Sequence, residues 1–137
     1  MQDPAYRLEI AVRLRDLDGV GHVNNAVTIA YLEDARNSYL MAERGLTRLE
    51  EVDFILARTE IDYRSPAHLG ERLEVLLRPT RIGSKSFDLE YEIRELTGAR
   101  VIAQARTVVV SYDFAARRTI AIPPALRALL ERDLRAS

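Results

Sequence analysis

The chain has 137 residues, of which 47% are hydrophobic and 30% charged, the size and composition of one soluble globular domain spanning residues 1–137. Its 20 basic and 21 acidic residues give a net charge of −1, which excludes a broad positive field for nucleic acid, and the lack of cysteine excludes disulfides, thiolate metal sites and cysteine nucleophiles. No apolar run approaches membrane-spanning length and no signal-peptide pattern opens the chain, so we expect a cytoplasmic protein without membrane or nucleic-acid partners.

The first predicted element is a strand near the N-terminus. Within residues 6–15, Leu8, Ile10, Val12 and Leu14 alternate mostly with charged residues. A period of two is typical of a strand that buries one face. We therefore expect all four apolar side chains to face the core.

A change of period at residue 26 predicts one long helix over residues 26–44. Apolar residues there recur at steps of three and four, which places them on one helical face. These residues are Ile29, Leu32, Ala35, Tyr39, Ala42 and Leu46. Gly45 stands where a helix C-terminus favours a left-handed residue, so we expect the helix to end there.

The rest of the chain predicts a sheet and a second, short helix. Four strand-like runs follow the long helix: residues 54–64, 72–82, 86–95 and 101–112. The last three are separated at hairpin spacing by turns that contain Gly83 and Gly98, where we expect positive φ, and they should form an antiparallel meander. Prolines open an amphipathic helix at residues 122–136. This order predicts an α+β fold in which the long helix lies along the concave face of a five-stranded antiparallel sheet.

The segment RDLDGVGHVNNA, residues 15–26, is the candidate functional motif. A turn followed by a helix cap accounts for its Asp, Gly and Asn residues, and Asp16 is most simply a turn residue. A turn and a cap do not explain why His22, one of only two histidines, stands between a pair of aspartates and a pair of asparagines. The other histidine, His68, lies in a proline-containing loop and is expected at the surface.

The order of elements and the stretch RLRDLDGVGHVNNAVTIAYLEDAR resemble the hotdog-fold acyl-CoA thioesterases, specifically the 4-hydroxybenzoyl-CoA thioesterase-like group. The family pattern of an Asp-x-Asp turn, a glycine and a helix with a Glu-x-Ala-Arg-like run falls here on Asp16, Asp18, Gly21 and the predicted helix. The segments DYRSPAHLGERLEV and RIGSKSFDLEYEI resemble the family's second-strand exit and central hairpin. The His-Val-Asn-Asn stretch resembles the acyl-carrier-protein thioesterase branch of the fold, although Val20 stands where that branch has asparagine.

The resemblance implies hydrolysis of a thioester without a metal or an organic cofactor. By resemblance, Asp18 is the nucleophile or the general base, His22 helps to activate water, and the backbone N–H of Asn25 contributes to the oxyanion site. A helix N-terminus suits an oxyanion on physical grounds as well, because its first N–H groups are unpaired and partly positive. The implied substrate is an acyl-CoA or acyl-carrier-protein thioester, so coenzyme A enters only as part of the substrate.

Five further residues are predicted to bind the substrate: Asn24, Ile29, Arg81, Ser84 and Lys85. Asn24 lies beside the motif and Ile29 on the helix that would line an acyl slot. Because the net charge is near zero, a polyanion such as coenzyme A needs local cations, which Arg81 and Lys85 of the hairpin supply. The family joins two sheets edge to edge with the active sites at the seam, so the resemblance implies a homodimer or a homotetramer.

Alternative functions are compatible with the same residues. A non-catalytic acyl-CoA binding or regulatory module would keep the Asp-His turn for structure, and a dehydratase or hydratase of the same fold would use a histidine–carboxylate pair in another sequence context. A metal site on Asp16, Asp18 and His22 lacks the paired spacing of strong sites, and a serine hydrolase lacks its Gly-x-Ser-x-Gly turn.

Overall fold

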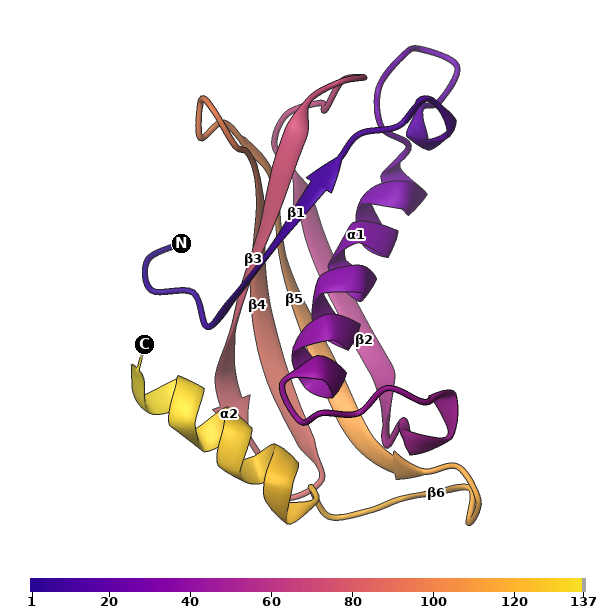
Figure 1. Ribbon diagram of the computed structural model, residues 1–137, viewed down its shortest axis with the longest axis vertical. Helices are drawn as coiled ribbons and strands as arrows, with labels where there is room; N and C mark the ends of the chain where they lie inside the picture. Colours follow the sequence, from indigo (N-terminus) through magenta and orange to yellow (C-terminus); the bar gives the residue numbers. More distant parts are fainter. Residues whose placement is uncertain (137) are drawn as a thin grey trace.

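The computed structural model describes residues 1–136 and shows an antiparallel sheet packed against helices (Figure 1). In chain order the elements are β1 (Tyr6–Ala11), α1 (Asn25–Asn37), β2 (Phe54–Tyr63), β3 (Arg72–Ile82), β4 (Ser86–Glu95), β5 (Val101–Asp113), β6 (Arg118–Thr119) and α2 (Pro124–Ala136). No helix within these residues is long and apolar enough to cross a membrane.

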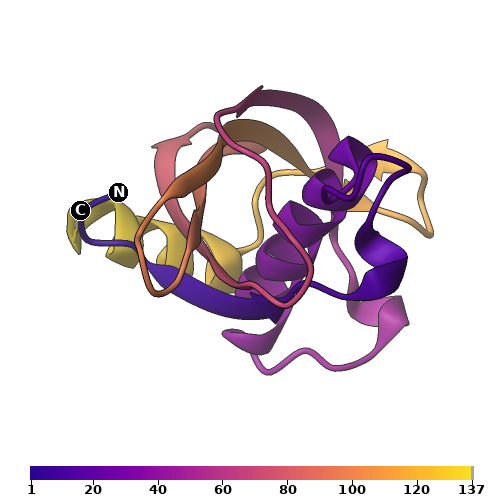
Figure 2. The same cartoon turned by 90° about the horizontal axis from the view of Figure 1, so that it is seen from above.

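The sheet has the strand order β1-β3-β4-β5-β2, and the short strand β6 pairs with β5. Every pairing is antiparallel, and β3, β4 and β5 form the predicted meander. The sheet curls around α1, which lies along its concave face as expected (Figures 1 and 2). The five predicted strands are present, and β6 is a sixth that the sequence patterns did not indicate. Strand β2 forms one edge of the sheet and β1 the other.

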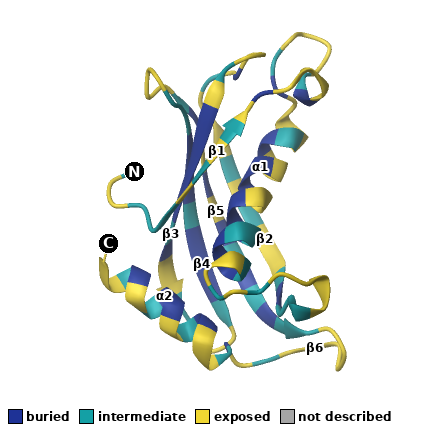
Figure 3. Cartoon of the chain, viewed as in Figure 1, coloured by how far each residue is buried: buried dark blue, intermediate teal, exposed yellow. Residues whose placement is uncertain are grey.

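The core lies between α1 and the concave face (Figure 3). The inward residues of β4 are fully buried, as their alternation predicts: Phe87, Leu89, Tyr91 and Ile93. Helix α1 contributes buried Leu32 and Ala35 to the same core. Helix α2 covers the core near the C-terminal end of α1. There the buried Tyr39 hydroxyl donates a hydrogen bond of 2.6 Å to Asp133 of α2.

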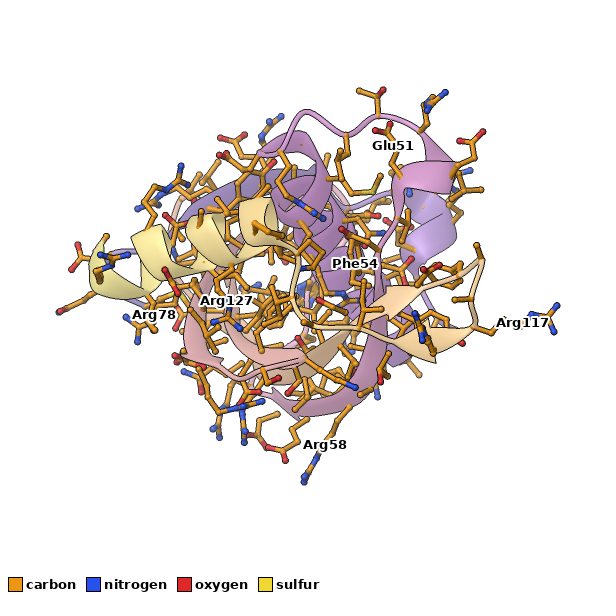
Figure 4. The ribbon with its side chains drawn as sticks, turned by 90° about the horizontal axis from the view of Figure 1, so that it is seen from below. Glu51, Phe54, Arg58, Arg78, Arg117 and Arg127 are labelled. Carbon is orange, nitrogen blue, oxygen red and sulfur yellow. The ribbon has the colours of Figure 1, made fainter. Side chains whose placement is uncertain are left out.

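The convex face of the sheet is covered by ion pairs between neighbouring strands. On β4, Asp88 is only 2% exposed and accepts hydrogen bonds from Arg81 on β3 at 2.9 Å and from Arg106 on β5 at 2.5 Å. Burial alone would raise the pKa of Asp88, but the two guanidinium groups lower it below its usual value. At the edge of the sheet, Arg58 of β2 points away from the core while Phe54 points into it (Figure 4).

The first strand is shorter than its alternation predicts. β1 ends at Ala11, and a 3₁₀ turn follows at Leu14–Asp16. Val12 is buried as expected, but Leu14 is 73% exposed, so the prediction that it faces the core is wrong. The turn forms because the Asp16 carboxylate accepts a hydrogen bond from the Arg13 N–H at 3.1 Å, which bends the chain away from the sheet before Leu14 can join it.

The long helix has the expected extent but changes its winding. α1 runs from Asn25 to Asn37 and continues as a π-helical turn at Ser38–Ala42, and Gly45 follows with a φ of 71°. Ile29 and Ala42 are not buried, although the period placed them on the apolar face. A hydrophobic period therefore located the helix but did not resolve which apolar side chains a curved sheet covers.

The prediction that the two hairpin glycines, Gly83 and Gly98, have a positive φ is wrong. Neither Gly83 nor Gly98 has a positive φ, and Ala99 carries the left-handed conformation in the second turn. At Gly83 a Cβ atom would lie 3.0 Å from the Ser86 carbonyl oxygen and 2.8 Å from the Arg81 guanidinium. Glycine at residue 83 is therefore favoured by the close approach of the two strands rather than by its backbone torsion.

Candidate active site

The loop between β1 and α1 folds back on itself and brings Asp18 and His22 together. The Asp18 N–H donates to the His22 carbonyl oxygen at 2.8 Å, and Leu17 and Val23 form an antiparallel bridge beside them. Gly21, with a φ of 86°, makes the tight reversal that this closure requires. The Val23 N–H donates to the Ala67 carbonyl oxygen at 3.0 Å, so the loop is also tied to the segment that follows β2.

The Asp18 carboxylate is anchored through one oxygen only. Its Oδ1 accepts hydrogen bonds from the N–H groups of Val20 at 2.9 Å and His22 at 3.3 Å. Within residues 1–136 its Oδ2 has no hydrogen-bonding partner, and the residue is exposed. The carboxylate is thus held in place while one oxygen stays available to a ligand.

The N-terminus of α1 presents unpaired donors next to this carboxylate. Asn24 is the N-cap, and its side chain accepts a hydrogen bond from the Ala26 N–H at 2.8 Å, as a cap residue should. The Thr28 N–H is bonded to the Asn24 carbonyl oxygen at 3.0 Å. In the described part of the chain the N–H groups of Asn25 and Val27 have no acceptor. They are the donors that this helix end offers to an anion.

Asp18, His22 and Asn25 meet at one cavity of about 280 Å³. Its other walls come from the loop before α1, α1 itself, the end of β2, the segment after β2 and β5: Val23, Thr28, Tyr63, Arg64, Ser65, Pro66, Ala67 and Ile102. The Tyr63 hydroxyl donates a hydrogen bond of 3.1 Å to the Asn25 carbonyl oxygen and so fixes the end of β2 against the start of α1. All three predicted catalytic residues therefore lie at this cavity.

The residues from the end of β2 are the part of the site that the motif did not predict. Tyr63, Ser65 and Ala67 follow the motif by about forty residues, and only the tertiary fold brings them to it. A signal for them was nonetheless present, because the segment DYRSPAHLGERLEV resembles the family's second-strand exit. His68 is exposed, as expected, but it lies against His22.

Asp16 has a structural position outside the cavity. It is 4% exposed and accepts hydrogen bonds from the Tyr31 hydroxyl at 2.7 Å and from the Arg13 N–H at 3.1 Å. Burial acts to raise its pKa, but these hydrogen bonds and the charge of Arg13 together lower the pKa below its usual value. Its interpretation as a turn residue is confirmed.

The predicted substrate-binding residues are spread over the molecule. Asn24 caps α1 between two cavity residues, Val23 and Asn25, but does not itself line the cavity. Ile29, on the same helix, is 38% exposed and does not line it either. The hairpin of Arg81, Ser84 and Lys85 lies at the other end of the sheet (Figure 1).

The strand pairings give the scale of this separation. Tyr63 pairs with Ala103 at the cavity end of β5, and Ser86 of the hairpin pairs with Val110, seven residues further on. That is about 23 Å along the strand. Arg81 is moreover bound to Asp88 and Ser86. Because the hairpin is far from the cavity of its own chain, the substrate-binding roles of Arg81, Ser84 and Lys85 stay predictions.

The arrangement suits attack on an activated carbonyl. A fixed carboxylate with a free oxygen can act as a base or a nucleophile, and unpaired helix N–H groups can stabilise the charge that develops on a carbonyl oxygen. Within residues 1–136 no three histidine, aspartate or glutamate side chains gather as metal ligands would. The fold and the site together are those of a hydrolase that acts on an acyl group, in which one helix lies against a curled antiparallel sheet.

Comparison with known proteins places the chain in that class. Residues 12–130 match the family model of the thioesterase-like superfamily. The chain is 29% identical over 122 residues to the 1,4-dihydroxy-2-naphthoyl-CoA hydrolase of Synechocystis sp., covering 86% of this chain and 88% of that protein. It is also 29% identical over 126 residues to the long-chain acyl-CoA thioesterase FadM of Escherichia coli, covering 90% of this chain and 96% of that protein.

Solved structures agree with the sequence relatives. A thioesterase from Thermus thermophilus, solved in complex with coenzyme A and zinc, superposes with a TM-score of 0.85 at 33% identity, covering 98% of this chain and 97% of that one. The Synechocystis 1,4-dihydroxy-2-naphthoyl-CoA thioesterase superposes with a TM-score of 0.82 at 29% identity, covering 91% and 94%. The chain belongs to the thioesterase-like superfamily, and it is a thioester hydrolase with the hotdog fold. The expected fold and enzyme class are confirmed.

Proposed function

We propose that this enzyme hydrolyses acyl-CoA thioesters to a free acid and coenzyme A, with Asp18 as the reacting carboxylate. One observation carries the proposal: the free Oδ2 of Asp18 and the unpaired N–H of Asn25 belong to the same cavity. The relatives named for coenzyme A thioesters support that carrier over an acyl-carrier protein.

In the proposed mechanism the thioester carbonyl oxygen accepts a hydrogen bond from the Asn25 N–H, with the Val27 N–H as a second donor of the same helix turn. Asp18 then acts as the general base that takes a proton from water, or as the nucleophile whose acyl anhydride water hydrolyses. His22, half-buried at the cavity wall, orients or activates that water. The C–S bond breaks, and the departing thiolate of coenzyme A takes up a proton. No metal or organic cofactor enters these steps.

The experiment that tests this function is a thiol-release assay on the purified protein with short-chain, long-chain and aromatic acyl-CoAs, and with an acyl-carrier-protein thioester for comparison. We expect catalytic thiol release from at least one acyl-CoA and slower release from the carrier-protein thioester. Tight acyl-CoA binding without thiol release would identify a binding module instead. A change in enoyl-CoA absorbance without thiol release would identify a hydratase or a dehydratase.

We further propose that the enzyme works as a homodimer joined through β2, which is consistent with the free edge of the sheet. Over its ten residues β2 pairs only with β5 in the described chain, so its other edge offers unpaired N–H and C=O groups. Antiparallel pairing of two β2 strands around a two-fold axis would place the Phe54 end of one copy beside the Tyr63 end of the other. A second cavity of about 540 Å³, lined in part by Met41, Val52 and Leu56, would then adjoin the partner's active site.

Light scattering at micromolar concentration checks this assembly. We expect a mass of at least twice 15.6 kDa, with a tetramer as the larger alternative. A Thr59→Pro substitution removes an N–H group from the free edge of β2 and should shift the protein toward a smaller species. Thr80→Pro on β3, far from the β2 edge, is the control for damage to a strand in general. A stable, active monomer would contradict the dimer.

The same pairing would carry the hairpin of one copy toward the active site of the other, because the hairpin lies at the Phe54 end of the sheet. Lys85 is exposed and has no ion-pair partner within residues 1–136, so it is the cation of this hairpin that is free to meet a phosphate. We expect Lys85→Ala to raise KM by about two- to five-fold for all acyl-CoAs alike.

The matched control is Arg117→Ala, which removes an exposed cation from the β5–β6 turn (Figure 4). An effect of Lys85→Ala that depends on acyl-chain length would assign the hairpin to the acyl group rather than to the nucleotide.

A further inference from the structure

His68 packs against His22 at the active site, and no step of the proposed mechanism uses it. The two imidazole rings meet edge to face, with centroids 5.2 Å apart and planes at 89°. Their backbones also form an antiparallel bridge, which joins the segment after β2 to the loop before α1. The contact is therefore built into two paired segments rather than made by one mobile side chain.

His68 is itself held by a chain of polar contacts. Its backbone N–H donates to Glu71 Oε1 at 2.7 Å, and its Nδ1 lies 3.1 Å from the same oxygen. Arg100, just before β5, binds both oxygens of Glu71 at 2.9 and 2.8 Å and donates to the Pro66 carbonyl oxygen at 3.2 Å. A network from Arg100 through Glu71 thus fixes the orientation of the His68 ring.

His22 has no comparable support of its own. Within residues 1–136 its imidazole nitrogens make no hydrogen bond, and the ring is half-buried at the cavity wall. The charged groups around it are Asp18 on its own loop and Arg64 across the cavity, and neither bonds to its ring. Among the hydrogen bonds and ring contacts of residues 1–136, the edge-to-face contact with His68 is the one that restricts the His22 ring.

We propose that His68 is a positioning residue for thioester hydrolysis, which holds the His22 imidazole toward the cavity through their ring contact. The proposal rests on the proposed function, in which His22 acts on water at the thioester. His68 itself does not line the cavity, so it does not touch the substrate. An edge-to-face aromatic pair favours the paired ring orientation over the unpaired ones by about two- to ten-fold in population.

Steady-state kinetics on the best acyl-CoA provide the first test. We expect His68→Ala to lower kcat by about three- to ten-fold with KM nearly unchanged, because it loosens His22 without removing a substrate contact. His68→Phe keeps a ring for the edge-to-face contact and should recover most of the lost kcat. Leu69→Ala, at an exposed position in the same segment, is the control for a general loosening of the loop and should behave like the wild type.

A double-mutant cycle separates positioning from a structural role. In a His22→Ala background, His68→Ala should cause no further loss of kcat, since the residue it positions is gone. Equal losses from His68→Ala with and without His22 would overturn the proposal, as would a His68→Ala enzyme with unchanged kcat. Wild-type protein that releases no thiol from any acyl-CoA would instead refute the proposed function.

Nuclear magnetic resonance tests the positioning without any assay of activity. The chain has two histidines, so a variant at residue 68 leaves His22 as the only imidazole signal. We expect one well-defined His22 ring signal in His68→Phe and a broadened or doubled signal in His68→Ala. A His22 signal that is equally sharp in both variants would show that His68 does not hold the ring, whatever the protein hydrolyses.

Discussion

Asp18→Asn is expected to lower kcat on the best acyl-CoA by about 10²–10⁴-fold, the range that loss of a general base or a nucleophile produces. An amide oxygen can still accept the backbone N–H groups of Val20 and His22, so the loop should keep its shape. The substitution removes only the charge and basicity of the free oxygen. Stability and KM should therefore stay close to those of the wild type.

The matched control for this variant is Asp34→Asn. Asp34 is an exposed aspartate on α1 that does not line the catalytic cavity, so the same chemical change should leave turnover intact. Urea unfolding of both variants establishes that activity is compared between folded proteins. A folded Asp18→Asn enzyme with near-normal turnover would remove Asp18 from the mechanism and leave His22 as the remaining candidate base.

The site residues that could be predicted from the sequence are those that lie close together along the chain. Asp18, His22 and Asn24 lie within seven residues, so turn and cap chemistry already brings them close together. Tyr63 and Ile102 could not be placed by such rules, because they reach the cavity only through the pairing of β2 with β5. That pairing is a property of the sheet topology and leaves no local pattern in the sequence.

The same distinction explains why the hairpin was harder to interpret. An arginine and a lysine beside two serines are typical of a phosphate site when read along the chain. In the folded protein Arg81 is bound to Asp88, which lies seven residues later on the neighbouring strand and also binds Arg106 from β5. Whether a cation is free depends on such cross-strand neighbours, and alternation within one strand does not reveal them.

Asp16→Asn is expected to reduce the free energy of unfolding by about 1.5–3 kcal/mol at neutral pH, the range for a charge-assisted hydrogen bond to a buried group. The carboxylate accepts from the Tyr31 hydroxyl and from the Arg13 N–H, and together they fasten the loop before α1 to the helix. Turnover of the folded variant should change much less than in Asp18→Asn, because Asp16 lies outside the cavity. Urea unfolding and kinetics on the same preparations measure the two effects separately.

The stability difference between wild type and Asp16→Asn should depend on pH in a direction set by the pKa of Asp16. Although burial opposes it, hydrogen bonding from Tyr31 and Arg13 holds the pKa of folded Asp16 below its usual value, whereas the unfolded chain has the ordinary aspartate pKa of about 3.9. A carboxyl group with a lowered folded-state pKa stabilises the protein above its unfolded pKa, and this contribution is lost as the pH falls through the folded-state pKa. The stability difference between wild type and Asp16→Asn should therefore be constant from neutral pH down to about pH 5 and shrink below about pH 4. A difference that stays the same down to pH 3 would show that the carboxylate charge of Asp16 does not stabilise the loop.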